Sequence, residues 1–169
     1  MFTILALAFA LADTVRFPTV TSENLEGTAM TLPADFAGER NIVFVAFERR
    51  QQDEVDTWVP FVKGLVARTP NTDFYEIPTI KRMMGIIRWT INRGMRGGIP
   101  DVAARERTVT LYIEKEPFKR SLAIATEETI QVLIVDRAGS VLWRTTGAFT
   151  AAKAAAMESA LEPPRRTTP

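Results

Sequence analysis

Residues 40–66 read RNIVFVAFERRQQDEVDTWVPFVKGLV, an apolar run followed by a polar loop and an amphipathic segment. The run Ile42–Phe47 is continuous and rich in β-branched and aromatic residues, which is typical of a central strand covered on both faces. After the loop, apolar residues recur at helical spacing, and Asp53 and Glu54 stand where a helix N-terminus favours negative charge. The stretch therefore predicts a buried strand that leads through a loop into a helix, which Pro60 should kink.

The rest of the chain supplies the remaining elements of an α/β fold. Residues 72–77 read as a second strand closed by Pro78, so strand, helix and strand form a right-handed parallel unit. Residues 132–144 read as two strands joined by the turn Asp136–Gly139, and residues 150–161 form an alanine-rich helix. We therefore expect a three-layer sandwich in which helices flank a mixed central sheet.

Three shorter elements complete this prediction. They are a hairpin within residues 17–33 that turns at Gly27, a strand over residues 108–113 and a short helical turn over residues 117–122. With 169 residues and 46% hydrophobic content, the chain can build one compact core. We place this domain at residues 13–161 and expect residues 162–169 to be a disordered tail.

The first residues suggest where the protein acts. Residues 2–12 read FTILALAFALA, a run too short to span a bilayer but within the length of a secretory signal, with small residues before a cleavage point. We predict a signal peptide over residues 1–12 and a periplasmic or secreted protein, although no basic residue follows Met1 directly. The alternatives are an uncleaved membrane anchor and a buried first element.

Composition excludes several activities. The chain contains no cysteine and no histidine, which removes dithiol oxidoreductase and cysteine peroxidase chemistry and the usual metal ligands. The formal net charge of +1 gives the whole molecule no field that would gather nucleic acid. We expect no metal, no cofactor and no nucleic-acid partner.

The loop 48–53 is the first candidate site, because it joins the end of a parallel strand to a helix N-terminus, where α/β sheets bind ligands. Its arginines can contact a carboxylate or phosphate with two hydrogen bonds, and its glutamines offer amide donors and acceptors. The alternative is a solvated loop in which Asp53 caps the helix and Glu48 pairs with an arginine. The candidate residues are Glu48, Arg49, Arg50, Gln51, Gln52 and Asp53.

The second candidate site is the glycine-rich sequence GMRGGIPD at residues 94–101, where the glycines permit close backbone approach. It lacks the spacing of a nucleotide-binding loop, and the alternative is a flexible connection. Residues 105–107 extend the charge and are expected to be a solvated face. The candidate residues are Arg96, Gly97, Gly98, Pro100 and Asp101.

Residues 80–95 form a basic amphipathic stretch. Ile80, Met84, Ile87, Ile91 and Met95 share one helical face. We expect this face to pack on the core, and the alternative is peripheral contact with an anionic membrane or a hydrophobic client helix.

The order of these elements resembles the thioredoxin-like superfamily, through the buried strand, the loop into a proline-containing helix and the closing hairpin VDRAGSVLWRTTG with its helix. More narrowly, FERRQQDEVDTW, GMRGGIPD, RTVTLY and VLIVDRAGSVLW are similar to bacterial proteins related to the mitochondrial ATP synthase assembly factor. The resemblance implies a chaperone-type or assembly role on a membrane-protein client. Two departures stand out: residues 50–53 replace the reactive dithiol, and Thr129-Ile130 stands where many relatives carry a cis-proline.

We therefore predict a cysteine-free binding protein for a protein client, with Arg50, Gln51, Arg96 and Asp101 as the leading contact residues. No catalytic residue is assigned, and the oligomeric state stays open. The alternative function is a small-molecule or anion-binding enzyme that uses carboxylate and arginine chemistry, for which Glu48 and Asp53 are the candidate acid–base pair.

Overall fold

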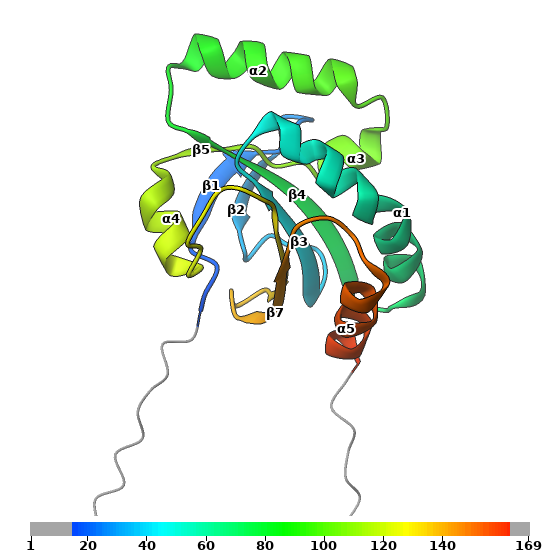
Figure 1. The fold of residues 1–169 in the computed structure, drawn as a ribbon. Helices are drawn as coiled ribbons and strands as arrows, with labels where there is room; N and C mark the ends of the chain where they lie inside the picture. The colour runs from blue at the N-terminus through cyan, green and yellow to red at the C-terminus, as the bar shows by residue number, and fades with distance from the viewer. Residues whose placement is uncertain (1–14, 163–169) are drawn as a thin grey trace, which may run out of the picture.

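The computed structural model describes residues 15–162, in which a five-stranded sheet lies between two helix-containing layers (Figure 1). The strand order is β5-β4-β3-β6-β7, and a separate two-stranded hairpin pairs β1 with β2. In chain order the elements are β1 (Val20–Glu23), β2 (Ala29–Leu32), β3 (Arg40–Ala46), the 3₁₀ turn η1 (Arg49–Gln51), α1 (Gln52–Arg68), β4 (Thr72–Lys81), α2 (Gly85–Gly98), α3 (Val102–Glu106), β5 (Leu111–Ile113), α4 (Lys115–Ser121), β6 (Gln131–Asp136), β7 (Val141–Thr146) and α5 (Ala151–Leu161).

The central strand β3 confirms the prediction from the apolar run. It pairs in parallel with β4 and antiparallel with β6, and β4 pairs in parallel with β5. Side chains alternate between the two faces, so Ile42 and Phe44 join the core against α1 and α5, whereas Val43 and Val45 join the opposite core. The second core is closed by α4 and the residues around β1 and β2. The mixed sheet with helices on both faces is the fold predicted from the sequence.

Trp58 anchors the core between the sheet and the helices α1 and α5. The side chain is fully buried, and its indole N–H donates to the carbonyl of Gly147 at 3.0 Å. Its ring meets that of Phe149 edge-on, with centroids 5.4 Å apart. Pro60 lies inside α1 without ending the helix, which continues to Arg68.

Pro78 does not close β4, contrary to the sequence prediction. The strand continues through Pro78 to Lys81. The reason is a change of partner, since Pro78 lies opposite Ala46 at the end of β3, and Thr79–Lys81 then pair with β5. A proline at the last position of one ladder leaves the following residues free to continue in another.

The prediction of a flexible connection at residues 94–101 is wrong. Helix α2 continues to Gly98, with the amide of Ile99 donating to the carbonyl of Met95 at 3.1 Å, and α3 follows directly after Asp101. None of the glycines in this stretch has a positive φ, unlike Gly27 and Gly139 in the two hairpin turns.

The prediction that residues 80–95 pack into the core is also wrong, because no residue of α2 is fully buried. The faces of the sheet are already covered by α1 and α5 on one side and by α4 with the β1–β2 hairpin on the other. Figure 1 shows α2 instead crossing the edge of the molecule, between the end of β4 and the start of α3.

The predicted signal peptide over residues 1–12 lies outside the described residues, as do residues 163–169 of the predicted tail. Within residues 15–162, no helix has the length and apolar character needed to cross a membrane.

The packing of Trp58 gives a first test. We expect Trp58→Phe to lower the free energy of unfolding by about 1–3 kcal/mol, because the substitution leaves the Gly147 carbonyl without its partner and removes buried volume. Urea unfolding measures this change. The matched control is Trp143→Phe, which alters a partly buried tryptophan at the same core and should cost less than about 1 kcal/mol. Equal losses in the two variants would contradict the anchoring role of Trp58.

Candidate functional site

The end of β3 and the start of α1 are held by the side chain of Gln51. This amide is fully buried, and its oxygen accepts hydrogen bonds from the backbone amides of Phe47 at 2.8 Å and Glu48 at 3.3 Å. Its nitrogen donates to the carbonyl of Glu127 at 2.6 Å. The amide of Gln51 is therefore used inside the molecule and is not presented to a partner from the loop surface.

A second contact joins the same two segments one helical turn further on. The carboxylate of Glu54 accepts a hydrogen bond from the hydroxyl of Thr129 and lies 3.5 Å from the backbone amide of Ile130. We call the contacts of Gln51 with Glu127 and of Glu54 with Thr129 the α1–β6 clamp. The clamp ties residues 51–54 to residues 127–130, the segment that leads into β6.

Glu127 is fixed from its other side as well. Its carboxylate pairs with Lys115 and, at 3.2 Å, with Lys119 on α4. Burial alone would raise the pKa of Glu127, but the hydrogen bonds from both lysines bring the pKa below its ordinary value, so the group stays charged. The segment before β6 is thus tied to α4 by side chains and to Gln51 by its backbone.

The other residues of the 48–53 loop are exposed. Arg50 pairs with Glu48, as the solvated-loop interpretation predicted, and the hydrogen bond to Glu48 raises the pKa of Arg50. Among the described residues Arg49 has no ion-pair partner, so its guanidinium is the one in this loop available to a carboxylate or phosphate. The prediction that Asp53 caps the helix is wrong, because α1 starts at Gln52 and Gln51 is its N-cap.

The residues of the second candidate cluster are engaged in contacts of their own. Arg96 forms an ion pair with Glu26 at 3.2 Å, and the carboxylate of Asp101 accepts from the amide of Ala103 at 3.0 Å, which caps α3. Lys63 on α1 lies 3.9 Å from Asp101.

The backbone between α2 and α3 is fixed by Arg105. Its guanidinium donates to the carbonyls of Ile99 at 2.8 Å and Pro100 at 3.0 Å, and it also pairs with Glu26. The prediction of a solvated charged face is therefore wrong for Arg105, and it is also wrong for Arg107, which is partly buried and pairs with Asp73 at 2.8 Å. Gly97 and Gly98 form the last turn of α2 and are exposed.

Within residues 15–162, no hydrogen bond or ion pair joins the 48–53 loop to residues 96–101. The second cluster contacts the far half of α1 through Lys63, whereas the loop lies at the start of that helix. The two predicted clusters are therefore separate features and do not form one site.

Glu76 on β4 is a titratable residue that the sequence interpretation missed. Burial raises the pKa of Glu76, the charge of Asp56 adds to the rise, and a 3.2 Å hydrogen bond from Gln52 opposes it. The same amide of Gln52 donates to Asp56 at 2.9 Å, so it bridges two carboxylates. The sequence did contain a signal for this residue, since Glu76 is the single acidic residue in the otherwise apolar strand sequence FYEIP. If the chain performs acid–base chemistry, Glu76 is better placed for it than Glu48 and Asp53, because Glu76 is partly buried whereas both of the others are exposed.

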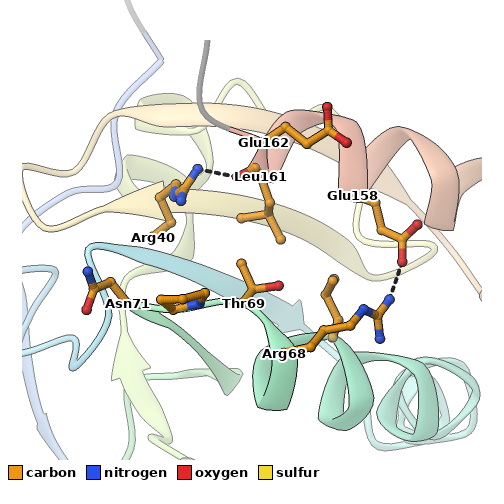
Figure 2. A pocket seen from close by; sticks show the side chains of 9 residues that line it. Arg40, Arg68, Thr69, Asn71, Glu158, Leu161 and Glu162 are labelled. Atoms are coloured by element: carbon orange, nitrogen blue, oxygen red, sulfur yellow. Dashed lines mark hydrogen bonds and ion pairs between the residues drawn. The ribbon is translucent and has the colours of Figure 1, made fainter. Parts of the chain in front are cut away.

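The surface also has an open hollow, at the opposite end of β3. Figure 2 shows its lining residues, with Arg68 paired with Glu158 and Arg40 donating to the carbonyl of Leu161. Both arginines are thus already engaged. The hollow lies between the ends of α1 and α5, away from the 48–53 loop. It is therefore not part of the candidate site at that loop.

No protein-family model matches the chain, and no curated protein matches it. Solved structures match over most of its length. The thioredoxin domain of a thiol-disulfide oxidoreductase from Bacteroides vulgatus is 16% identical, with a TM-score of 0.55 and coverage of 90% of this chain and 100% of that chain. A member of the Sco family of cytochrome c oxidase assembly proteins is also 16% identical, with a TM-score of 0.59 and coverage of 88% and 94%.

A third match is an exposed lipoprotein thioredoxin from Streptococcus pneumoniae, which is 10% identical, with a TM-score of 0.54 and coverage of 85% and 98%. These likenesses show the fold of the chain. The chain has the thioredoxin-like fold that its sequence predicts, and it has this fold without any cysteine.

The clamp gives a second test. We expect Gln51→Ala to lower the free energy of unfolding by about 2–4 kcal/mol, because it leaves the buried amide of Phe47, the amide of Glu48 and the Glu127 carbonyl without partners. Denaturant unfolding measures the loss. The control is Arg49→Ala two residues away, whose exposed side chain should change stability by less than about 0.5 kcal/mol. A Gln51→Ala variant as stable as the control would contradict the clamp.

Glu76 gives a third test, through the pH dependence of stability. Because the folded pKa is raised, the proton on Glu76 favours folding at low pH, and this contribution is lost as pH rises from the ordinary value of 4.5 through the folded pKa. Glu76→Gln stays neutral and still accepts from Gln52. We expect the variant to gain stability over the natural chain as pH rises across that window, measured by urea unfolding at a series of pH values.

Glu26 provides a contrast of opposite sign, since the hydrogen bond from Arg105 lowers its pKa. Glu26→Gln should lose stability at neutral pH, and the loss should shrink as pH falls below 4.5. A pH-independent difference between Glu76→Gln and the natural chain would contradict the raised pKa of Glu76.

Proposed function

We propose that this chain is a non-redox thioredoxin-like protein that binds a protein client and acts as an assembly or chaperone-type factor. The observation that carries the proposal is the α1–β6 clamp. In place of a reactive dithiol the chain has a buried amide with three hydrogen bonds, which fixes the loop geometry and leaves no nucleophile there. A rigid loop that presents charged side chains suits recognition better than covalent chemistry.

The proposed client-binding surface is the exposed part of the 48–53 loop. Arg49 offers a guanidinium with no ion-pair partner among the described residues, and the Glu48–Arg50 pair beside it supplies both signs of charge. A carboxylate on an extended segment or at the end of a client chain could accept two parallel hydrogen bonds from Arg49. Gln52 and Asp53 border this surface at the start of α1.

A membrane-protein client and a location outside the cytoplasm are part of the proposal. They follow from the apolar residues 2–12 and from the sequence resemblance to bacterial proteins related to the mitochondrial ATP synthase assembly factor. Two structures that share the fold belong to an exposed lipoprotein and to a family of cytochrome c oxidase assembly proteins, and are compatible with this setting.

The alternative function is an enzyme that uses carboxylate chemistry, and one observation favours it. Burial raises the pKa of Glu76, and the Gln52 amide donates to both Glu76 and Asp56, so two carboxyl groups lie close together with one of them desolvated. We rank it second because the hollow between the ends of α1 and α5 is lined by neither Glu76 nor Asp56.

Site-specific crosslinking tests the binding function. A photoreactive residue in place of Asp53, which borders the surface and leaves Arg49 intact, should capture one discrete membrane protein when the full chain is expressed in its native cells, identified by mass spectrometry. The control places the same residue at Arg120, an exposed position on α4, where that product should be absent. The charge-reversed variant Arg49→Glu should compete for the client at least about tenfold less well than the natural chain. Equal crosslinking at both positions, or none, would contradict a client-binding role for the loop.

A further inference from the structure

Helix α2 is an amphipathic helix with its apolar side chains in solvent. It has 14 residues, none of them buried. Three of its apolar side chains are strongly exposed: Ile86 by 68%, Trp89 by 57% and Ile87 by 46%. Met84, which directly precedes the helix, is 71% exposed. Ile86 and Trp89 are three residues apart and are therefore neighbours on one face of the helix, with Ile87 on its flank and Met84 directly before the helix.

The helix touches the body of the protein along one side only. The hydroxyl of Tyr112 donates to the side chain of Asn92 at 2.7 Å, and Arg96 pairs with Glu26. Asn92 is partly buried, as are Ile91 and Met95. At 100° per residue Ile86 and Trp89 lie on the side opposite Met95, which is the side that faces away from the body. Figure 1 shows this outer side of α2 open along its length at the margin of the molecule.

A helix of this composition has little stability of its own. Four of its residues are glycine, and Gly94 in its interior makes the helix about 1 kcal/mol less stable than alanine would. A side-chain carbon at Gly85, Gly94, Gly97 or Gly98 would meet no atom within 4 Å. Packing inside the chain therefore gives no reason for these glycines, and a helix this short gains most of its stability from an apolar surface that covers it.

The charge of the segment indicates what covers it. Between Lys81 and Arg96 there are five basic residues and no acidic one, whereas the rest of the chain has 16 basic and 20 acidic residues. The guanidinium of Arg93 lies 5.2 Å from the centre of the Trp89 ring, which places a cation beside the exposed apolar side chains. An apolar surface with tryptophan and interspersed arginines is complementary to a bilayer that contains anionic phospholipid.

We propose that residues 81–98 are a docking surface for an anionic phospholipid membrane, with α2 lying parallel to the bilayer. Ile86 and Trp89 enter the boundary between headgroups and acyl chains, with Ile87 on the flank of this face. Arg82 and Arg93 contact lipid phosphates, whereas the guanidinium of Arg88 lies over the ring of Tyr112 on the side that faces the body. This goes beyond the proposed client binding, which uses the 48–53 loop, and it holds whether or not that client exists.

Vesicle binding tests the proposal with the full chain. We compare vesicles of phosphatidylcholine alone with vesicles that also contain phosphatidylglycerol, and measure co-sedimentation and tryptophan emission. Trp58 is fully buried and Trp143 is partly buried, so a blue shift on binding reports Trp89. We expect binding and a blue shift with the anionic vesicles only, and weaker binding as salt is raised.

Variants separate α2 from the apolar residues 2–12, which could hold the chain on lipid by themselves. Arg93→Glu and Ile86→Ser should each weaken binding to anionic vesicles, Arg93→Glu by more than about tenfold, because about 1 kcal/mol is gained per basic residue at such a surface. Ile86→Ser should also abolish the blue shift. The matched controls Arg120→Glu and Leu142→Ser change an exposed cation on α4 and an exposed apolar residue on β7, and should bind as the natural chain does.

Equal binding by the α2 variants and the natural chain would overturn the proposal, as would binding to both vesicle types without a shift of Trp89 emission. Concentration-dependent self-association that Ile86→Ser removes, without vesicle binding, would overturn it in favour of a second copy of the chain as the covering surface. Circular dichroism establishes that each variant is folded, so a loss of binding is not a loss of structure.

Discussion

The buried amide of Gln51 is the contact on which the arrangement of the loop depends. It satisfies two backbone amides where β3 leaves the sheet and reaches the segment that enters β6. A neutral amide can do this because it is donor and acceptor at once, whereas a carboxylate in the same place would only accept. A buried amide without hydrogen-bond partners would destabilise the fold. The end of β3, the start of α1 and the segment before β6 therefore depend on the one side chain of Gln51 for their arrangement.

This constraint also separates the chain from the chemistry of other proteins with its fold. Where a thiol would need access to a substrate, Gln51 needs to be enclosed, and the enclosing segment is fixed through Glu127 to α4. The surface that remains at the loop consists of charged side chains around a closed backbone. Such a surface favours recognition by charge and shape, with Arg49 as its free cation among the described residues.

The sequence predicted those elements whose signals are local. β3 and β6 are apolar runs, and the turn after β6 requires a positive φ, which Gly139 adopts without strain. These elements can therefore be recognised from the local sequence alone. The errors arose where a distant partner decides the structure. β4 continues past Pro78 because β5 pairs with the residues beyond it, and α2 stays outside the core because both faces of the sheet are already occupied.

The same reasoning applies to the site. The exposure of Arg49 and Arg50 follows from their position in a loop. The burial of Gln51, in contrast, depends on its hydrogen bond to Glu127, and Arg96 is held by its ion pair with Glu26. No pattern within the loop reveals either partner. Glu76 differs, because one acidic residue within an apolar strand can be recognised in the sequence as a group that will be partly desolvated.

The separation of 76 residues between Gln51 and Glu127 has a consequence for the order of folding. The unit β3-α1-β4 is formed by neighbours in sequence, whereas the clamp needs β6 to be in place beside β3. Loop closure over such a distance is slow, so the strand–helix–strand unit should form with its polar amide still hydrated. A contact that forms after the rate-limiting step slows unfolding far more than it speeds folding. Gln51 would then set the lifetime of the native state, not how quickly the chain reaches it.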